Sequence, residues 1–245
     1  MKPEGEILML GTIINTGAII AGGLLGLLFG KLIRDRHQET LIAACGIGTM
    51  FLGMAGAMNY MLHHDLLPGG GGMLLVICLA LGGLIGEAVN IEHLFERFGE
   101  WLKKKTGNAK DQSFVQGFLT ASLTVCIGAM AIMGAIQDGI SGDWSTLGAK
   151  SVLDLIIILV MTCSMGKGCI FSAVPVFLWE GSLTLLAGVI RPLMTDLAMG
   201  YLSFVGSVLI FCVGLNLVWG KKIRVANLLP AVLLAVLAAF LPVTF

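Results

Sequence analysis

Residues 147–166 read LGAKSVLDLIIILVMTCSMG, a stretch in which Lys150 and Asp154 are the only charged residues. A helix of about 20 apolar residues crosses a hydrocarbon core about 30 Å thick. Similar stretches recur along the chain, and together they predict about eight membrane spans, with seven as the alternative: 8–30, 40–62, 71–90, 114–137, 147–166, 169–190, 199–219 and 225–243. The sequence therefore predicts an all-α, polytopic transmembrane helix bundle, with residues 1–245 forming a single transmembrane domain.

The composition agrees with a membrane protein. Of 245 residues, 57% are hydrophobic and 12% are charged, and the mean hydropathy is +0.94. A soluble domain carries about a quarter charged residues, so a soluble enzyme is excluded. The 15 basic and 15 acidic residues balance to a net charge of zero, which gives no reason to expect nucleic acid as a partner.

The basic residues predict the orientation of the chain. Twelve of the 15 fall on one side of the eight predicted spans, namely Lys31, Arg34, Arg36, Arg97, Lys103, Lys104, Lys105, Lys110, Lys167, Lys221, Lys222 and Arg224. Lys and Arg are enriched in cytoplasmic loops. We therefore expect a multi-pass protein of a bacterial inner membrane with both termini outside.

Residues 91–105 (IEHLFERFGEWLKKK) are too polar for a span. Their apolar residues recur at helical spacing opposite the glutamates and lysines, which is typical of an amphipathic helix lying in the membrane interface. We expect this helix on the cytoplasmic side, as a strut between two spans, with a partner-docking role as the alternative.

Short strings recur in the first two predicted helical hairpins. GGLLG at 22–26 matches GGLIG at 82–86, and IGTM at 47–50 matches IGAM at 127–130. The order is the same in both copies, so the sequence predicts an internal duplication of a helical hairpin, a feature common in transporters.

Glycines in these strings form stripes at four-residue spacing: Gly22, Gly26 and Gly30, and then Gly82 and Gly86. Small residues let membrane helices approach closely. We expect tight packing within the bundle, and the alternatives are a homo-oligomer contact through these helices or unwound segments that bind substrate.

Two acidic residues stand inside predicted spans. Asp154 lies about two turns into 147–166, and Glu180 lies near the middle of 169–190, five residues after Pro175. Ionisable groups inside a membrane are costly and mark functional sites by default. These two carboxylates are the strongest functional signal in the sequence.

Further polar residues join them as candidate ligands for an ion or solute. Sodium is a candidate near Asp154 and Asp138, although each amide or hydroxyl also suits an ordinary interhelical hydrogen bond. A purely structural ion pair of Lys150 with Asp154 or Asp138 is the alternative for Lys150. The full candidate set is Asp138, Asp154, Glu180, Gln137, Lys150, Ser151, Asn15, Asn216 and Asn227.

The chain carries no nucleotide or zinc-protease motif, and its cysteines lack the spacing of a zinc site. We therefore expect no cofactor and no catalytic residues. Gly139-Ile140-Ser141-Gly142 formally matches a GxSG string of intramembrane serine proteases, but a base is required, and only His63 and His64 share its side of the membrane.

Several long strings resemble one bacterial membrane family, the YqgA/YdfK type (domain of unknown function 554). They include GTIINTGAIIAGGLLG (11–26), IGAMAIMGAIQDG (127–139), AKSVLD (149–154), GKGCIFSAVPVFLWEG (166–181) and GLNLVWGKKIRVANLLPAVLL (214–234). The resemblance implies a multi-pass inner-membrane protein of a type sometimes described as a transporter. It implies no catalytic residues and no substrate.

The leading functional hypothesis is a secondary transporter or channel for a small ion or polar solute. Proton or sodium coupling would pass through the buried carboxylates. The alternatives are a non-transporting assembly or regulatory subunit, in which the buried charges pair with one another, and, more remotely, an intramembrane hydrolase. The expected partners are the lipid bilayer and the small ion or polar solute.

Overall fold

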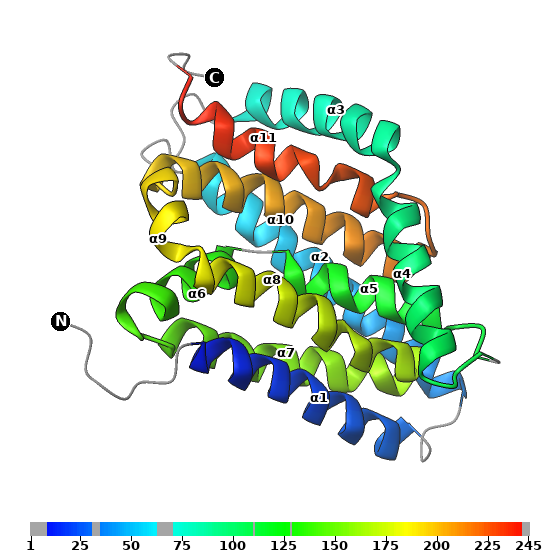
Figure 1. Cartoon of the computed structure of the whole chain (residues 1–245). Coiled ribbons are helices and arrows are strands. Elements are labelled where there is room, and N and C mark those ends of the chain that lie inside the picture. The colour runs from blue at the N-terminus through cyan, green and yellow to red at the C-terminus, as the bar shows by residue number, and fades with distance from the viewer. Residues whose placement is uncertain (1–8, 31–34, 63–70, 110, 128, 242–245) are drawn as a thin grey trace. The chain divides into compact units, whose positions relative to one another are not determined.

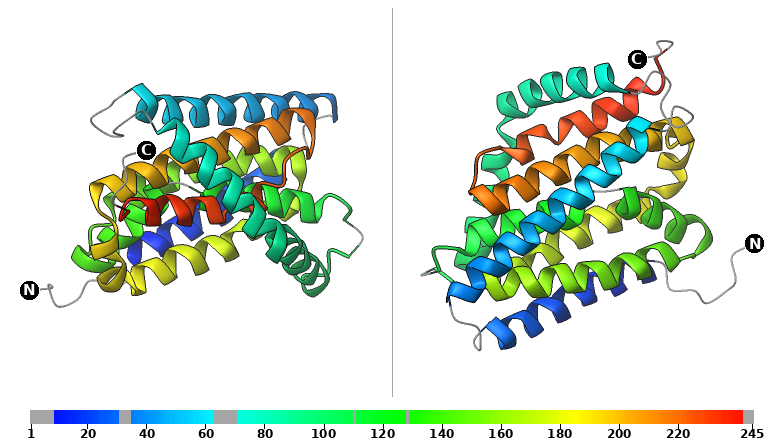
Figure 2. Two further views of the ribbon diagram at one scale, coloured as in Figure 1. Left: turned by 90° about the horizontal axis from the view of Figure 1, so that it is seen from above. Right: turned by 180° about the vertical axis from the view of Figure 1, so that it is seen from behind.

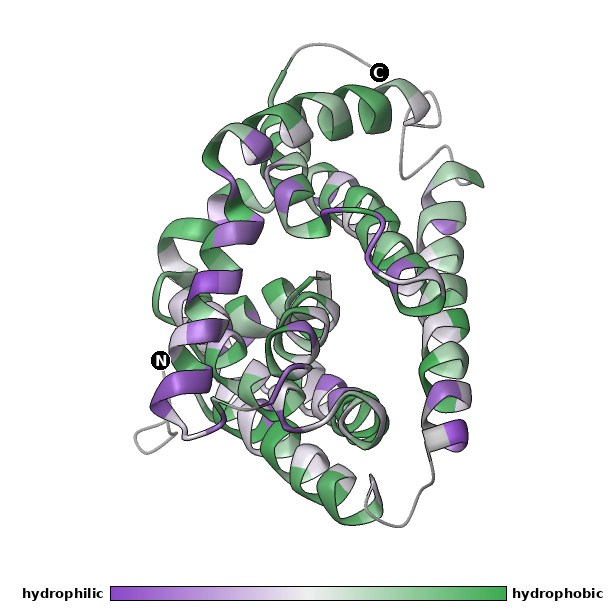
Figure 3. Ribbon diagram, turned by 90° about the vertical axis from the view of Figure 1, so that its right-hand side faces the viewer, coloured by the Kyte–Doolittle hydropathy of each residue, from purple (hydrophilic) through white to green (hydrophobic). Residues whose placement is uncertain are grey.

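The computed structural model describes residues 9–30, 35–62, 71–109, 111–127 and 129–241, and the regular structure in these residues is entirely helical. The α-helices, drawn in Figure 1, are α1 (Leu10–Gly30), α2 (Asp35–Leu62), α3 (Gly72–Val89), α4 (Ile91–Lys105), α5 (Phe114–Cys126), α6 (Ala129–Ser141), α7 (Ser145–Met165), α8 (Ala173–Leu185), α9 (Ala187–Ile190), α10 (Asp196–Trp219) and α11 (Pro230–Ala238). Short 3₁₀ segments are η2 (Lys167–Ser172), η3 (Arg191–Leu193) and η4 (Val225–Leu228). The all-α membrane fold is confirmed, and Figure 3 shows how much of the ribbon is hydrophobic.

Fewer helices meet the length and hydropathy of a membrane span than the eight predicted. Among the described residues, six are long and apolar enough to cross a membrane: α1, α2, α3, α7, η2 with α8, and α10. The predicted span 114–137 is instead two helices, α5 and α6, bent by 62° at their junction, and it makes a seventh span only if the bent pair is counted as one. Composition alone cannot reveal such a bend.

The predicted last span, 225–243, is also shorter than expected. Its first residues form the 3₁₀ segment η4, and α11 begins at Pro230 and ends at Ala238. Proline fits the first turn of a helix because its missing N–H would have no partner there. Pro175 likewise lies in the first turn of α8, which begins at Ala173 after η2, so neither proline interrupts the interior of its α-helix.

The chain divides into two compact units. The first comprises residues 1–45, 96–126 and 130–191, and the second comprises 46–95, 127–129 and 192–245. The prediction of one transmembrane domain stays a prediction, and the two units are described separately.

In the first unit, α1 and α7 run side by side in the same direction (Figure 1). A Cβ added at Gly22 would overlap the carbonyl oxygen of Leu155, and one at Gly26 would lie 2.5 Å from the carbonyl oxygen of Leu159. The glycine stripe of α1 therefore allows backbone contact with α7, as predicted from its spacing.

This contact makes a specific prediction for stability. We expect Gly26→Ala to destabilise the protein by about 1–3 kcal/mol, the usual range for overpacking, because the added methyl group would also lie 2.7 Å from Thr162 Cβ. Gly17→Ala is the matched control on the same helix, since, apart from the neighbouring backbone of α1 itself, nothing lies within 4 Å of its added Cβ. Thermal unfolding in detergent checks both variants, and equal melting temperatures would contradict the packing.

In the second unit, α3 packs against α11, and the later part of α2 packs against α10 (Figure 2). The core gathers side chains from all four helices, including Leu74, Cys78, Phe204 and Ala231. A Cβ at Gly82 would overlap Ala231, and one at Gly86 would overlap the carbonyl oxygen of Asn227. The glycine stripe of α3, like that of α1, therefore allows close helix packing within the chain.

The two glycine stripes pack against segments that run in different relative directions. Along α1 the contacted residues of α7 ascend with the glycines, whereas Gly82 meets Ala231 and Gly86 meets the earlier Asn227. The α1–α7 pair is therefore parallel, and the α3–α11 pair is antiparallel. The matching strings do not make equivalent contacts, so the internal duplication stays a prediction.

The amphipathic segment 91–105 forms α4 with the predicted bounds. Within the first unit, Phe98 stacks on Trp101 at 5.8 Å and contacts Phe118 of α5 at 5.9 Å. Trp101 is about half exposed, so an aromatic side chain remains available at the surface of this helix. Its placement in the membrane interface stays a prediction.

Candidate functional site

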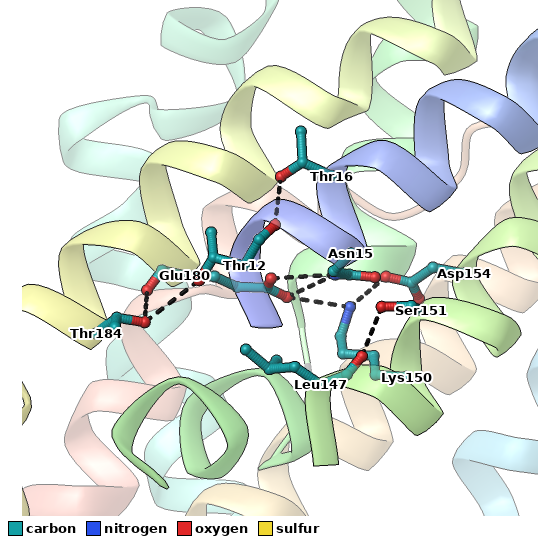
Figure 4. Close-up of polar contacts among 9 residues, drawn as sticks. All are labelled: Thr12, Asn15, Thr16, Leu147, Lys150, Ser151, Asp154, Glu180 and Thr184. Atoms are coloured by element: carbon teal, nitrogen blue, oxygen red, sulfur yellow. Dashed lines mark hydrogen bonds and ion pairs between the residues drawn. The ribbon is translucent and has the colours of Figure 1, made fainter. Parts of the chain in front are cut away.

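Four of the predicted site residues meet inside the first unit. Asn15 comes from α1, Lys150 and Asp154 from α7, and Glu180 from α8 (Figure 4). All four are buried, and Asn15 and Glu180 have no exposed surface. We call this set the polar cluster.

Lys150 lies between the two acids of the polar cluster. It forms a hydrogen-bonded ion pair with Asp154, and its Nζ lies 3.3 Å from Oε1 of Glu180. The predicted pairing with Asp154 is therefore present, and Glu180 is an additional partner that was not predicted. A buried charge is tolerated only when it is paired and hydrogen-bonded in this way.

Asn15 bridges the acids from the opposite side. Its Nδ2 donates to both carboxylate oxygens of Glu180, at 2.9 and 3.1 Å. Figure 4 shows the Asp154 carboxylate on the other side of the Asn15 amide. The Oδ1 atom of Asn15 is buried and has no hydrogen-bond partner. An unpaired buried acceptor is costly, so this atom needs an explanation.

The register of the helices explains why these residues meet. The parallel contact of α1 with α7 places the start of α1 beside the start of α7, and a Cβ added at Gly11 would lie 2.9 Å from Leu147 Cβ. Asn15 is one turn beyond Gly11, and Lys150 is nearly one turn beyond Leu147, so the same contact brings these two together.

Cys126 lies near the polar cluster, within electrostatic range of Lys150, Asp154 and Glu180. It is the last residue of α5, immediately before the bend into α6. Discontinuous helices of this kind often line binding sites in membrane transporters. No pattern in the sequence assigns Cys126 to the site, since it is one of six cysteines in apolar surroundings.

Asp138, Gln137 and Ser151 lie in the first unit but have local roles. Asp138 is buried and its Oδ2 accepts a 3.0 Å hydrogen bond from the backbone N–H of Gly11, at the start of α1. A carboxylate there is stabilised by the free N–H groups of the helix terminus. Gln137 accepts from the Thr146 hydroxyl at 2.7 Å, and the Ser151 hydroxyl donates to the carbonyl of Leu147 at 2.7 Å.

Asn216 and Asn227 lie in the second unit, where Asn216 organises the connection between α10 and α11 and Asn227 joins this connection to α3 and α4. Asn216 accepts from the N–H groups of Lys222 and Ile223 and donates to the carbonyl of Ile223. Asn227 donates to Oε2 of Glu87 at 2.6 Å and accepts from the N–H of Glu92 at 2.7 Å. The side-chain N and O atoms of both amides therefore already have hydrogen-bond partners outside the polar cluster.

Two threonines extend the polar cluster and were not predicted. The Thr184 hydroxyl donates to the carbonyl of Glu180 at 2.9 Å, and Thr12 Oγ1 lies 3.3 Å from Thr184 Oγ1. Thr12 precedes Asn15 by three residues, and Thr184 follows Glu180 by four, so helical spacing from the two central residues could have identified both.

The structure bears on two other predictions about chemistry. Among the described residues, no three His, Cys, Asp or Glu side chains come together in a way that could hold a metal ion. The Ser141 hydroxyl is exposed and donates to the carbonyl of Gln137 at 2.8 Å. His63 and His64, the predicted partners of Ser141, lie outside the described residues.

Comparisons with known proteins agree with the membrane fold. The chain is 32% identical over 232 residues to "Uncharacterized membrane protein YdfK" of Bacillus subtilis (strain 168), covering 95% of this chain and 96% of that protein. It is 30% identical over 233 residues to "Uncharacterized protein YqgA" of Escherichia coli (strain K12), covering 93% and 95%. No solved structure gives a significant match. A family model matches residues 10–240, and the chain therefore belongs to the family described as "Protein of unknown function (DUF554)".

Proposed function

We propose that this membrane protein is a secondary transporter or channel for a small ion or polar solute, coupled to a monovalent cation through Asp154 and Glu180. The observation that carries the proposal is the polar cluster, in which two acids and one lysine are buried among membrane-length helices. Ionisable groups in such a position are expensive and are retained mainly where ions or protons move.

The architecture around the polar cluster supports the proposal. The α5–α6 pair is bent next to Cys126, and the 3₁₀ segment η2 directly precedes α8. Interrupted helices free backbone groups that can bind a solute near the middle of a membrane. We further propose an inner-membrane location with both termini outside, as the distribution of basic residues indicates.

Reconstitution in vesicles tests this proposal. Vesicles of phosphatidylethanolamine and phosphatidylglycerol, loaded with a pH-sensitive dye, are given a pH gradient in choline chloride or in NaCl. We expect the protein to dissipate the gradient faster than protein-free vesicles do in at least one salt. We expect Asp154→Asn to slow this dissipation at least about tenfold, which corresponds to a barrier change of about 1.4 kcal/mol.

Asp143 supplies the matched control for this substitution. It is an exposed acid between α6 and α7, and its Oδ1 accepts a hydrogen bond from the backbone N–H of Ser145. Hydrogen bonds from the Ser145 side chain and backbone lower the pKa of Asp143, so it is ionised at neutral pH. Asp143→Asn should leave the flux unchanged. Equal flux in wild type, Asp154→Asn and protein-free vesicles would contradict the proposal.

A second candidate is a passive assembly or regulatory subunit. Lys150 contacts both acids of the polar cluster, which is the pairing that this function requires. Under this second function, the charges of the polar cluster serve only to hold the helices together. The two functions differ in what a charge exchange between positions 150 and 154 should do.

A further inference from the structure

The charges of the polar cluster do not balance. Lys150 contributes one positive charge, whereas Asp154 and Glu180 contribute two negative charges when both are ionised. All three side chains are at most 8% exposed. An uncompensated charge in such surroundings costs several kcal/mol, and buried groups usually neutralise to avoid that cost. The cluster thus lacks one positive charge.

The orphaned acceptor of Asn15 indicates where that charge resides. The Asn15 amide lies between the two carboxylates (Figure 4), and its Nδ2 donates to Glu180. Its Oδ1 is fully buried and lacks a donor. Rotating the amide by half a turn would exchange N and O, but it would still leave an acceptor atom beside a carboxylate. A carboxylate cannot donate to Oδ1, whereas a carboxylic acid can.

We propose that Asp154 and Glu180 share one proton, which the protein exchanges with water during its cycle. The proton sits on a carboxyl oxygen, donates to Asn15 Oδ1 and leaves the cluster neutral; on release it passes to water and a carboxylate remains. The inference rests on the proposed function and deepens it by naming the coupling ion. Because the two acids share one lysine, they titrate as a pair.

The other titratable groups around the pair do not supply the missing charge. Among the described residues of the packed helices, α5 contributes Cys126, which is not a cation, and α6 contributes Asp138, which is a further acid and is bound to the start of α1. Within the part of the chain that the structure describes, Lys150 is the one basic group that contacts either acid. Any negative charge on Asp138 increases the need for a proton.

Infrared spectroscopy of the full chain in detergent tests the inference without reference to transport. A protonated carboxylic acid has a carbonyl stretch that a carboxylate lacks. We expect this band in the wild type at neutral pH, and we expect ¹³C labelling of aspartate and glutamate side chains to shift it. The ¹³C-labelling experiment uses the wild-type sequence, so its result is informative even if the substituted variants fold poorly.

Substitutions then assign the band. We expect its complete loss in Asp154→Asn and in Glu180→Gln, because each variant leaves a single acid balanced by Lys150. Asp143→Asn should keep it. Absence of the band in the wild type, or its persistence in both cluster variants, would overturn the proposal. Its loss on adding NaCl at constant pH, but not choline chloride, would also overturn it and assign the site to an alkali cation.

The infrared test of the shared proton and the vesicle test of transport can fail independently of one another. Vesicles that show no flux while the band is present would refute transport and leave the shared proton intact. Vesicles that show flux dependent on Asp154 while the band is absent would refute the shared proton and leave transport intact.

Discussion

Lys150→Met is expected to destabilise the protein by about 3–5 kcal/mol, the usual cost of breaking a buried ion pair from one side. The substitution keeps most of the side-chain volume, so the loss comes from the charge. It leaves Asp154 and Glu180 facing one another without the ammonium group that contacts both. Chemical or thermal unfolding in detergent measures the change.

The loss of folding stability caused by Lys150→Met should become smaller as the pH falls. In this variant the folded protein must hold protons on both acids, whereas the unfolded chain releases them at neutral pH. The folded state therefore binds more protons than the unfolded state, and stability decreases as the pH rises. A deficit that does not change with pH would contradict the assignment of the loss to these two acids.

Two controls accompany this prediction. Lys104→Met removes an exposed lysine of α4 and should change stability by no more than about 0.5 kcal/mol. The triple variant Lys150→Met, Asp154→Asn, Glu180→Gln removes all three charges and should recover most of the loss, because neutral groups avoid the cost of desolvation. A triple variant as unstable as the single one would show that shape, and not charge, is responsible.

Exchanging the charges of positions 150 and 154 is expected to separate folding from transport. Lys150→Asp and Asp154→Lys should each destabilise the protein, since each leaves like charges buried together. The double variant restores one positive charge beside the acids and should recover stability beyond the sum of its parts, as coupled residues do. Its unfolding is compared with that of both single variants.

The same double variant should not restore flux. The shared acid pair would then involve positions 150 and 180, with a lysine where Asp154 stood, so the carboxyl group that faces Asn15 from α7 is lost. A double variant with wild-type flux would show that any balanced pair suffices, and it would contradict the specific role proposed for the Asp154 carboxyl group. A double variant that folds but does not transport supports the proposed function.

The sequence predicted those parts of the fold that depend on local pattern. The lengths of the apolar stretches predicted α1, α3, α7 and α10, and helical periodicity predicted α4 with its observed bounds. It overestimated the spans where the backbone is interrupted, because the bend between α5 and α6 and the 3₁₀ segment η4 are set by packing that composition does not encode.

The candidate site was predictable only in part for a similar reason. Asp154 and Glu180 stood out because charge is rare in apolar helices, and the Lys150–Asp154 pair followed from four-residue spacing. The meeting of Asn15 with Glu180 spans 165 positions in the chain, so no local pattern could show it. Asn216 and Asn227 are likewise amides in apolar segments, but Asn216 organises a loop and Asn227 bonds to α3 and α4.

The accessibility of Cys126 to water tests the central claim most directly, because this residue lies beside the polar cluster. The five other cysteines, Cys45, Cys78, Cys163, Cys169 and Cys212, are replaced by alanine, and a membrane-impermeant methanethiosulfonate reagent is added to reconstituted protein. A matched protein keeps only Cys163, which is buried and donates to the carbonyl of Gly26 in the α1–α7 contact.

If the polar cluster opens to water in the working protein, Cys126 will be labelled in folded protein in the membrane, and Cys163 will be labelled only after denaturation. If Cys126 also stays unlabelled until the protein is denatured, in choline chloride and in NaCl and across the pH range in which the protein remains folded, then water does not reach the buried acids and the transport account is wrong.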